Sequence, residues 1–242
     1  MVDIHCHILP SIDDGSKSWE MSAEMCRVAV QDGVKHIVAT PHCNDEFPYD
    51  RERYTEMLSQ LSKVAEGKLS FSMGCDFHFS YDNIQDAIIN PRRYTIGDSH
   101  YLLIEFSDYG ISPNVLQNIF QICSAGLIPI ITHPERNMVL QKHPERVLDL
   151  IERGCLVQVT ANAITGFWGG RPRKIGEWLL KRGAVHFIAS DAHDPKRRNP
   201  VLSEARNAAA EIIGPELANA LVEDNPEAVI SGKPIPYHAM YS

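Results

Sequence analysis

Short apolar runs alternate with longer segments of mixed apolar and polar residues through most of the chain. Seven runs have the length of buried strands, and they lie at residues 2–5, 35–40, 69–75, 101–106, 127–132, 155–160 and 185–190. The segments between them mostly place apolar residues three or four positions apart, as Met21, Met25 and Val28 are, which predicts amphipathic helices. Continuous apolar strands that alternate with helices are typical of parallel strands covered by helices.

Three dipeptides with proline as the second residue predict where helices begin. Ser112 and Pro113 predict a helix with serine at the N-cap and proline at its first position. Two Asn-Pro pairs, at 199–200 and 225–226, predict the starts of later helices. The segment 77–100 contains turn residues but no clear periodicity, so no element is assigned there.

The N-terminal stretch combines a predicted strand with a cluster of polar side chains. His5 and His7 are two residues apart, so on a strand both imidazoles point to one face while Cys6 points to the other. Asp13 and Asp14 follow in a polar turn. Two histidines and a carboxylate at a strand end suit a metal ion, although a surface strand end with hydrogen-bonded histidines explains the same residues.

Side chains of the metal-binding types recur at the ends of the other predicted strands. Six of the seven strands carry an imidazole or a carboxylate there: His5 and His7, His42, Asp76, Glu105, His133, and Asp191 with His193. A doubly wound sheet also fits the alternation, but it would hold its outer strands too far apart to share one centre. In a (β/α) barrel the C-terminal ends of all strands meet at one mouth, where active sites lie. The pattern therefore favours an α/β barrel, formed by one domain over residues 1–242.

Each of these residues also has an ordinary structural role available. His42 could cap a helix, Glu105 could pair with an arginine in the core, and His133 could close a turn. Asp191 could be a helix N-cap. One polynuclear site explains all of them together better than separate incidental roles do. Five other histidines are expected to be structural or solvent-exposed, and they are His36, His100, His143, His186 and His238.

Composition and charge narrow the class of protein. Apolar residues make up 44% of the 242 residues, which is enough to bury a large core. The net charge of −8 argues against a general nucleic-acid binder, because phosphate backbones require a basic surface. The six cysteines form no CxxC pair, and the sequence shows neither a signal peptide nor an apolar run of about 20 residues. We expect a reduced cytoplasmic protein without disulfides or membrane insertion.

The predicted ligands are nitrogen and oxygen donors, which suit Mn²⁺, Zn²⁺ or Fe²⁺ and not an iron–sulfur cluster. About eight protein ligands exceed what one tetrahedral ion takes, so two or three ions are expected. Clustered ions activate water and hold a phosphoryl group during in-line displacement. Arg136 follows His133 closely, and Arg197 and Arg198 follow His193, so these arginines are candidates to bind the phosphate. One arginine of the latter pair is expected to be solvated.

Short motifs spread along the chain resemble those of one known family. They lie in family order at 3–7 (DIHCH), 13–15 (DDG), 39–42 (ATPH), 74–76 (GCD), 104–105 (IE), 132–136 (THPER), 158–161 (QVTA), 165–169 (TGFWG), 189–193 (ASDAH) and 224–227 (DNPE). Together they resemble the PHP-type bacterial protein-tyrosine phosphatases of the CpsB/CapC group, found with capsular and extracellular polysaccharide systems. The resemblance implies a distorted, TIM-like (β/α)7 barrel with a trinuclear metal centre that usually depends on manganese.

The resemblance also implies how the ligands are divided among the ions. The groups are His5, His7, Asp76 and Asp191 for one ion; Asp76, Glu105 and His133 for a second; and Asp14, His42 and His193 for a third. Arg136 and Arg198 match the phosphate-binding arginines of the family, which leaves Arg197 as the solvated one.

Two positions depart from the family pattern. Asp76 stands where the family usually has glutamate, so its carboxylate is one methylene shorter at a position shared by two ions. Asp194 stands where asparagine is common, and its charge would lie near the bound phosphate. We expect neither change to abolish function.

The expected activity is manganese-dependent hydrolysis of phosphotyrosine by metal-activated water, with Arg136 and Arg198 stabilising charge on the phosphate oxygens. The resemblance implies a protein substrate, the tyrosine-rich tail of a kinase of polysaccharide assembly, and a role in regulating capsule or exopolysaccharide synthesis. The alternatives are a small-molecule phosphomonoesterase such as a histidinol-phosphatase, a phosphodiesterase or nuclease, and a non-catalytic metal-binding regulatory protein. The sequence indicates neither an oligomeric state nor a general acid.

Overall fold

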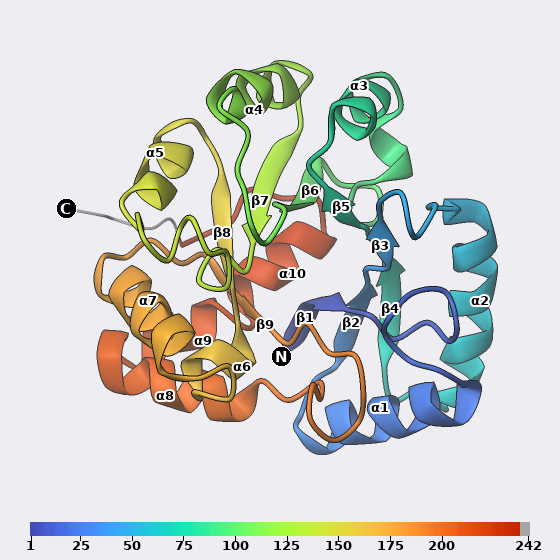
Figure 1. Cartoon of the computed structure of the whole chain (residues 1–242). Helices are drawn as coiled ribbons and strands as arrows, with labels where there is room; N and C mark the ends of the chain where they lie inside the picture. Colours follow the sequence, from blue (N-terminus) through green and yellow to red (C-terminus); the bar gives the residue numbers. More distant parts are fainter. Residues whose placement is uncertain (238–242) are drawn as a thin grey trace.

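The structure, a computed structural model, describes residues 1–237, and its strands form a ring with helices outside it (Figure 1). The strands are β1 Val2–Cys6, β2 His36–Ala39, β3 His42–Cys43, β4 Ser70–Met73, β5 Asp76–His78, β6 Tyr101–Glu105, β7 Ile128–Thr132, β8 Leu156–Thr160 and β9 Phe187–Ala189. All of their pairings are parallel. The seven predicted strands are confirmed, but breaks after the second and the third separate them from two short strands that were not predicted: β3 follows β2, and β5 follows β4.

The breaks lie at Pro41 and Gly74, and they divide the strands between two sheets. One sheet has the order β1-β2-β4, and the other has the order β3-β5-β6-β7-β8-β9. Gly74 is required because a Cβ there would lie 2.9 Å from Cγ1 of Val38. After the breaks, His42 on β3 and Asp76 on β5 lie directly opposite each other.

The ring closes between β1 and the segment that follows β9. The Asp191 amide donates to the His5 carbonyl at 2.8 Å, and the His7 amide donates to the Ala192 carbonyl at 2.8 Å. Cys6 and Ala192 form an isolated parallel bridge. The fold is therefore a distorted (β/α)7 barrel: the polar strand ends predicted a barrel, and the family resemblance implied this form of it.

Helices cover the outside of the barrel (Figure 1). They are α1 Trp19–Gln31, α2 Arg51–Val64, α3 Tyr81–Ile89, α4 Val115–Ser124, α5 Arg146–Glu152, α6 Ala161–Ile164, α7 Gly170–Lys181, α8 Ser203–Ile213, α9 Pro215–Ala220 and α10 Asp224–Ile230, with a 3-10 turn η1 at Pro91–Arg93. Of the helices within residues 1–237, none has the length and apolar character needed to cross a membrane.

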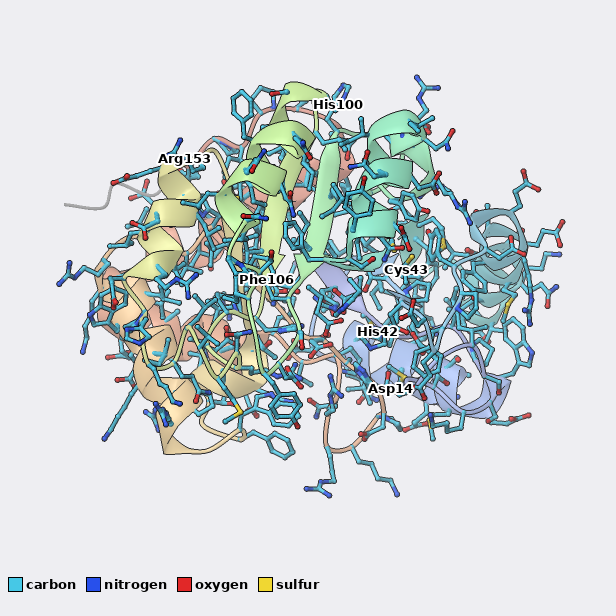
Figure 2. The ribbon with its side chains drawn as sticks, turned by 45° about the horizontal axis from the view of Figure 1, so that its top comes forward. Asp14, His42, Cys43, His100, Phe106 and Arg153 are labelled. Atoms are coloured by element: carbon cyan, nitrogen blue, oxygen red, sulfur yellow. The ribbon has the colours of Figure 1, made fainter. Side chains whose placement is uncertain are left out.

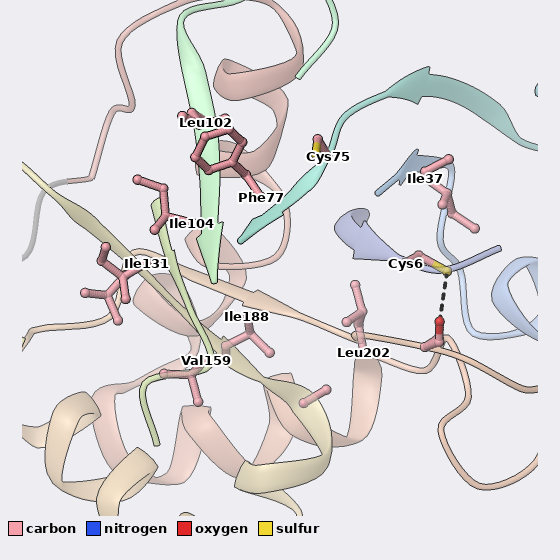
Figure 3. Close-up of a cluster of buried hydrophobic side chains, with 14 of the residues drawn as sticks. Cys6, Ile37, Cys75, Phe77, Leu102, Ile104, Ile131, Val159, Ile188 and Leu202 are labelled. Carbon is pink, nitrogen blue, oxygen red and sulfur yellow. Dashed lines mark hydrogen bonds between the residues drawn. The ribbon is translucent and has the colours of Figure 1, made fainter. Parts of the chain in front are cut away.

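Two clusters of buried apolar side chains lie on the two faces of the barrel strands, one inside the barrel and one between the strands and the helices. The inner cluster includes Ile4, Leu103, Ile130 and Phe187 from the strands and Val229 from α10, which closes one end. The outer cluster joins the opposite strand faces to the helices, and Figure 3 shows Cys6, Ile104, Ile131, Val159 and Ile188 within it. Successive residues of β6, β7 and β9 thus enter different clusters, as period-two geometry requires. The polar side chains at the C-terminal ends of the strands lie beyond the inner cluster, at the mouth of the barrel.

Some predicted helix starts are wrong, and the unassigned segment is structured. Helix α4 begins at Val115 and not at Pro113, because the Ser112 hydroxyl accepts from the Asn114 amide within a turn that precedes the helix. Helix α8 begins at Ser203, three residues after Pro200, and not at the predicted Asn199-Pro200 pair. The Asp32 carboxylate accepts a hydrogen bond from the Ser203 amide.

The two remaining segments also differ from the sequence pattern. Asn225 lies inside α10, where its amide donates to the His186 and Tyr237 carbonyls and so serves packing instead of capping. Between residues 77 and 100, Ser80 caps α3 by accepting from the Asn83 amide. This helix is only nine residues long, which explains why its periodicity was not visible.

Candidate metal centre

The imidazoles of His5 and His7 leave the end of β1 together. Their Nε2 atoms are 3.3 Å apart, and both side chains are buried. His5 Nδ1 donates to Oε1 of Gln158 at 3.0 Å, and His7 Nδ1 donates to Oδ2 of Asp13 at 2.8 Å. These bonds turn the lone pair of each Nε2 toward the other residues of the centre, which is how outer partners orient histidine ligands of metals. The prediction that both imidazoles share one face, with Cys6 on the other, is confirmed.

In the loop after β1, the side chains of two adjacent aspartates point in different directions, Asp13 toward the His7 ring and Asp14 toward the mouth of the barrel. The Asp13 carboxylate accepts from the Gly15 amide at 2.9 Å and binds the ring of His7, while Asp14 reaches the mouth with half of its side chain exposed. Gly15 is required here, because a Cβ would lie 2.3 Å from the His7 carbonyl oxygen. Asp13 is a supporting residue: the family resemblance assigned Asp14 as a ligand and gave Asp13 no role, since adjacency alone does not say which carboxylate turns inward.

Asp76 lies at the middle of the centre. Its Oδ2 atom is 3.2 Å from His42 Nδ1, 3.5 Å from His5 Nε2 and 3.9 Å from His7 Nε2. Both carboxylate oxygens are buried and have no hydrogen-bond partner. Burial disfavours its charge, but His5 and His42 outweigh this effect and hold the pKa of Asp76 well below its usual range. A buried carboxylate that is ionised and lacks hydrogen bonds is the expected state of a metal ligand.

Two further carboxylates bridge the imidazoles around Asp76. Asp14 Oδ1 is 3.3 Å from His42 Nε2 and 3.1 Å from His193 Nε2 (Asp14 and His42 are labelled in Figure 2). The two oxygens of Glu105, at the end of β6, lie 3.5 Å from His42 Nδ1 and 3.6 Å from His133 Nε2. Each carboxylate therefore faces two different rings.

His133 and Asp191 follow β7 and β9 in the left-handed backbone conformation, with φ of 33° and 51°. This conformation costs on the order of 1–3 kcal/mol for residues other than glycine, and it is concentrated at functional sites. Burial lowers the pKa of His133 well below its usual range, and Arg136 adds to this effect, so the imidazole is neutral and retains a lone pair. Oδ1 of Asp191 lies 3.5 Å from Nε2 of both His5 and His7.

The donor set fits a group of divalent ions. Two ligand atoms that each lie about 2.1 Å from one ion are roughly 3.0–3.5 Å apart, and most of the separations above are in this range. Three groups of ligand atoms are compact enough to hold an ion: His7, Asp14, His42 and His193; His5, His7 and Asp76; and His42, Asp76 and Glu105. The structure thus brings all nine predicted ligands together.

The compact groups resemble the predicted division of ligands but differ from it in detail. His7 and His42 each belong to two groups, whereas the family pattern assigns each to one ion. His133 and Asp191 lie beside the groups and not within them. The assignment of each ligand to an ion stays a prediction.

Two guanidinium groups converge on the other oxygen of Asp191. Arg136 Nη1 and Arg198 Nη2 both donate to Oδ2, the latter at 2.7 Å. Both guanidiniums also lie over the ring of Trp168, at 4.7 and 5.3 Å from its centroid. Trp168 was part of a motif but had no predicted role, because only the fold brings its loop to the two arginines. Arg197 is exposed, as predicted.

The carboxylate of Asp194 has a structural role in the loop that carries Arg198. It accepts from the backbone amides of Lys196, Arg197 and Arg198 at 2.7, 2.7 and 3.1 Å. These three hydrogen bonds disperse its charge, so the departure from asparagine is accommodated within the loop.

Four of the histidines expected to be structural or exposed lie away from this centre. His36 contacts Ser70 and Ser72, the His186 ring accepts from the Val157 amide, and His100 and His143 are exposed; His238 lies outside the described residues. A cavity of about 590 Å³ lies at the opposite end of the barrel, where Tyr101, Ile128 and Leu156 begin their strands. It contains none of the compact ligand groups, so the site chemistry lies at the mouth.

The fold and the site together define a PHP-type barrel with a candidate polynuclear metal centre. A family model described as capsular polysaccharide synthesis, CpsB/CapC, matches residues 1–231, and the chain belongs to this family.

Curated relatives and a solved structure agree with this assignment. The chain is 36% identical to the putative tyrosine-protein phosphatase CapC of Staphylococcus aureus, over 86% of this chain and 82% of the relative. It is 33% identical to the tyrosine-protein phosphatase YwqE of Bacillus subtilis, over 93% and 89%. A solved structure from work on YwqE and on CpsB of Streptococcus pneumoniae, described as metal-dependent tyrosine phosphatases, matches with a TM-score of 0.90 and 32% identity over all of both chains.

Proposed function

We propose that this chain is a manganese-dependent protein-tyrosine phosphatase, with residues 1–242 forming one catalytic domain. Its metal ligands would be His5, His7, Asp14, His42, Asp76, Glu105, His133, Asp191 and His193, and its phosphate-binding residues Arg136 and Arg198. Its substrate would be a phosphotyrosine protein, the tail of a tyrosine kinase of polysaccharide assembly. Its role would be the regulation of capsule or exopolysaccharide synthesis in the cytoplasm.

One observation carries the catalytic part of this proposal. The two oxygens of Asp191 face different groups, because Oδ1 lies near His5 and His7 while Oδ2 accepts from Arg136 and Arg198. The residue therefore joins the candidate metal centre to a pair of guanidiniums. Guanidiniums recognise phosphate oxygens through paired N–H donors, and a phosphoryl group between them and the centre would meet both.

The residues of this chain can bind and orient a phosphate monoester. When bound, divalent ions would supply Lewis acidity and activate a water for attack on phosphorus. Arg136 and Arg198 would bind the non-bridging oxygens and stabilise the charge that develops there. The phenol of tyrosine has a pKa of about 10, so it leaves more readily than an alkyl alcohol, and its release needs little help from a protonated side chain.

A substrate panel with metal analysis tests the proposal. The purified chain is stripped with EDTA, reloaded with Mn²⁺, Zn²⁺ or Fe²⁺, and assayed on a phosphotyrosine peptide, a phosphoserine peptide, histidinol phosphate and a phosphodiester. We expect the highest kcat/KM on phosphotyrosine with Mn²⁺, and bound metal in proportion to activity. Preference for histidinol phosphate would make the chain a small-molecule phosphatase, and full activity without metal would overturn the mechanism.

Arginine variants separate phosphate binding from folding. Arg136→Lys and Arg198→Lys should raise KM or lower kcat by at least about tenfold, because lysine keeps the charge but loses the paired donors. Arg153→Lys is the matched control, since Arg153 is exposed and remote from the centre (Figure 2). Equal activity in all three variants would remove the arginines from the proposed site.

A further inference from the structure

A groove of about 220 Å³ lies beside the candidate metal centre. It is lined by Asp108, Tyr109, Arg136, Met138, Trp168 and Pro172. Tyr109 is 81% exposed and Met138 is 47% exposed, so two large apolar side chains face solvent at the mouth of the barrel. Exposed apolar groups that gather in a hollow next to a polar site are typical of a binding surface.

The groove is continuous with the proposed phosphate site. Arg136 lines the groove and also donates to Oδ2 of Asp191, and Trp168 lines the groove and also lies under the guanidiniums of Arg136 and Arg198. A ligand whose phosphate contacts the two arginines would therefore place its next atoms at the groove.

The geometry points to this groove as the subsite for the phenyl ring of the substrate phosphotyrosine. The inference rests on the proposed function and adds to it the residues that distinguish an aryl phosphate from an alkyl phosphate. Indole, phenol, thioether and proline surfaces are favourable partners for an aromatic ring. The volume suits one ring, since sites for drug-sized ligands occupy roughly 300–1,000 Å³. A serine phosphate would reach the arginines but would leave these surfaces uncovered.

Hydrogen bonds connect two of the three segments that form the groove, and Trp168 and Pro172 belong to the third. The Met138 amide donates to the Asp108 carbonyl at 3.0 Å, and the Asn137 side chain donates to the Ser107 carbonyl at 2.8 Å. These bonds fix the loop after β6 to the loop after β7, so the side of the groove that Tyr109 and Met138 line is formed before a ligand arrives. A preformed groove lowers the conformational cost of binding a ring.

Binding of two phosphonates tests the subsite without requiring catalysis. Phenylphosphonate carries the ring and methylphosphonate does not, and calorimetry with the Mn²⁺-loaded protein measures Kd for each. In the Tyr109→Ala/Met138→Ala variant, we expect phenylphosphonate to bind about tenfold more weakly, which corresponds to ~1.4 kcal/mol, and methylphosphonate to change less than twofold. The matched control is Tyr81→Ala, because Tyr81 is 73% exposed on α3 and does not line the groove.

Three results would overturn the inference: equal weakening of both phosphonates, no change in either, or the same loss in the Tyr81→Ala variant. Trp168→Phe gives a second measurement, since it keeps a ring beside the arginines and should retain most of the phenylphosphonate affinity, whereas Trp168→Leu should not. Hydrolysis of the phosphotyrosine peptide is measured separately. Absence of that activity with intact, groove-dependent binding of phenylphosphonate would reject the proposed function alone.

Discussion

His42 and Asp76 lie directly opposite each other on the paired strands β3 and β5, with Nδ1 3.2 Å from Oδ2. Both atoms are buried and neither has a hydrogen-bond partner. When Nδ1 carries no proton, two lone pairs that face each other in this way cost free energy unless a cation binds both, and a divalent ion would do so. The pairing of β3 with β5 thus creates a place for an ion, and a bound ion would in turn stabilise this part of the barrel.

The first prediction concerns the charge of Asp76. Asp76→Asn keeps the shape of the side chain but removes the charge, so we expect the loss of at least one ion per chain. We also expect kcat/KM to fall by more than the ~10–100-fold that substitutions of outer partners cost. Asp76→Glu should retain metal, since it keeps the carboxylate that binds the ions. Elemental analysis of the purified variants measures both effects, and Asp98→Asn, at an exposed position, is the control.

The second prediction concerns Asp13, which binds the ring of His7 but is not a predicted ligand. Asp13→Ala removes the acceptor that orients His7, so the affinity for Mn²⁺ should fall by about 10–100-fold while the ligand set stays complete. Asp13→Asn retains an acceptor oxygen and should lose less. Chelator competition measures the affinities, and the exposed Asp45→Ala provides the baseline. Unchanged affinity in the alanine variant would show that His7 is held by other contacts.

The third prediction concerns stability without metal. Ions that bind only the folded chain stabilise it by ~2.7 kcal/mol at a concentration 100-fold above Kd, so EDTA should lower Tm by roughly 5–10 °C for a chain of this size. Addition of Mn²⁺ should restore Tm in the native chain and restore less of it in Asp76→Asn. Differential scanning calorimetry measures the change. An identical Tm with and without metal would mean that the nine side chains do not bind ions in the folded state.

The positions of the predicted ligands follow from the sequence because strand ends are visible in it. Glu105 and His133 each follow a continuous apolar run, and parallel strands bring such ends to one mouth. The strand breaks at Pro41 and Gly74 were harder to predict, because each lies within or beside an apolar run that has the pattern of one continuous strand. The sequence shows only a proline and a glycine at these positions. Whether such a residue interrupts a strand depends on which other strand lies beside it in the fold.

The supporting residues could not be predicted in the same way. The role of Asp13 depends on the path of a loop, and the left-handed backbone at Asp191 depends on closure of the barrel. Trp168 reaches Arg136 and Arg198 from a different loop, so no sequence spacing relates them. These contacts arise from tertiary structure, and local pattern contains no information about them.

The fourth prediction concerns pH and a histidine far from the metal centre. His36 on β2 has Nδ1 2.7 Å from Oγ of Ser70 and Nε2 2.9 Å from Oγ of Ser72, both on β4. Burial lowers the pKa of His36 to about 4, against about 6.5 in an unfolded chain. Between these values the unfolded chain binds more protons than the folded one. His36 therefore contributes stability that is fully present above about pH 6.5 and is lost as pH falls toward 4.

Glutamine at this position cannot titrate, so His36→Gln should lack that loss. We expect the free energy of unfolding of the native chain, relative to the variant, to decrease as pH falls from 7.5 to 4.5. Urea titrations at several pH values measure the difference, with EDTA present throughout so that metal binding does not change with pH. His100→Gln is the control for the exchange of histidine for glutamine, because His100 is exposed and belongs to neither β2 nor β4. A difference for His36→Gln that is independent of pH would show that the ring is protonated as readily in the fold as outside it.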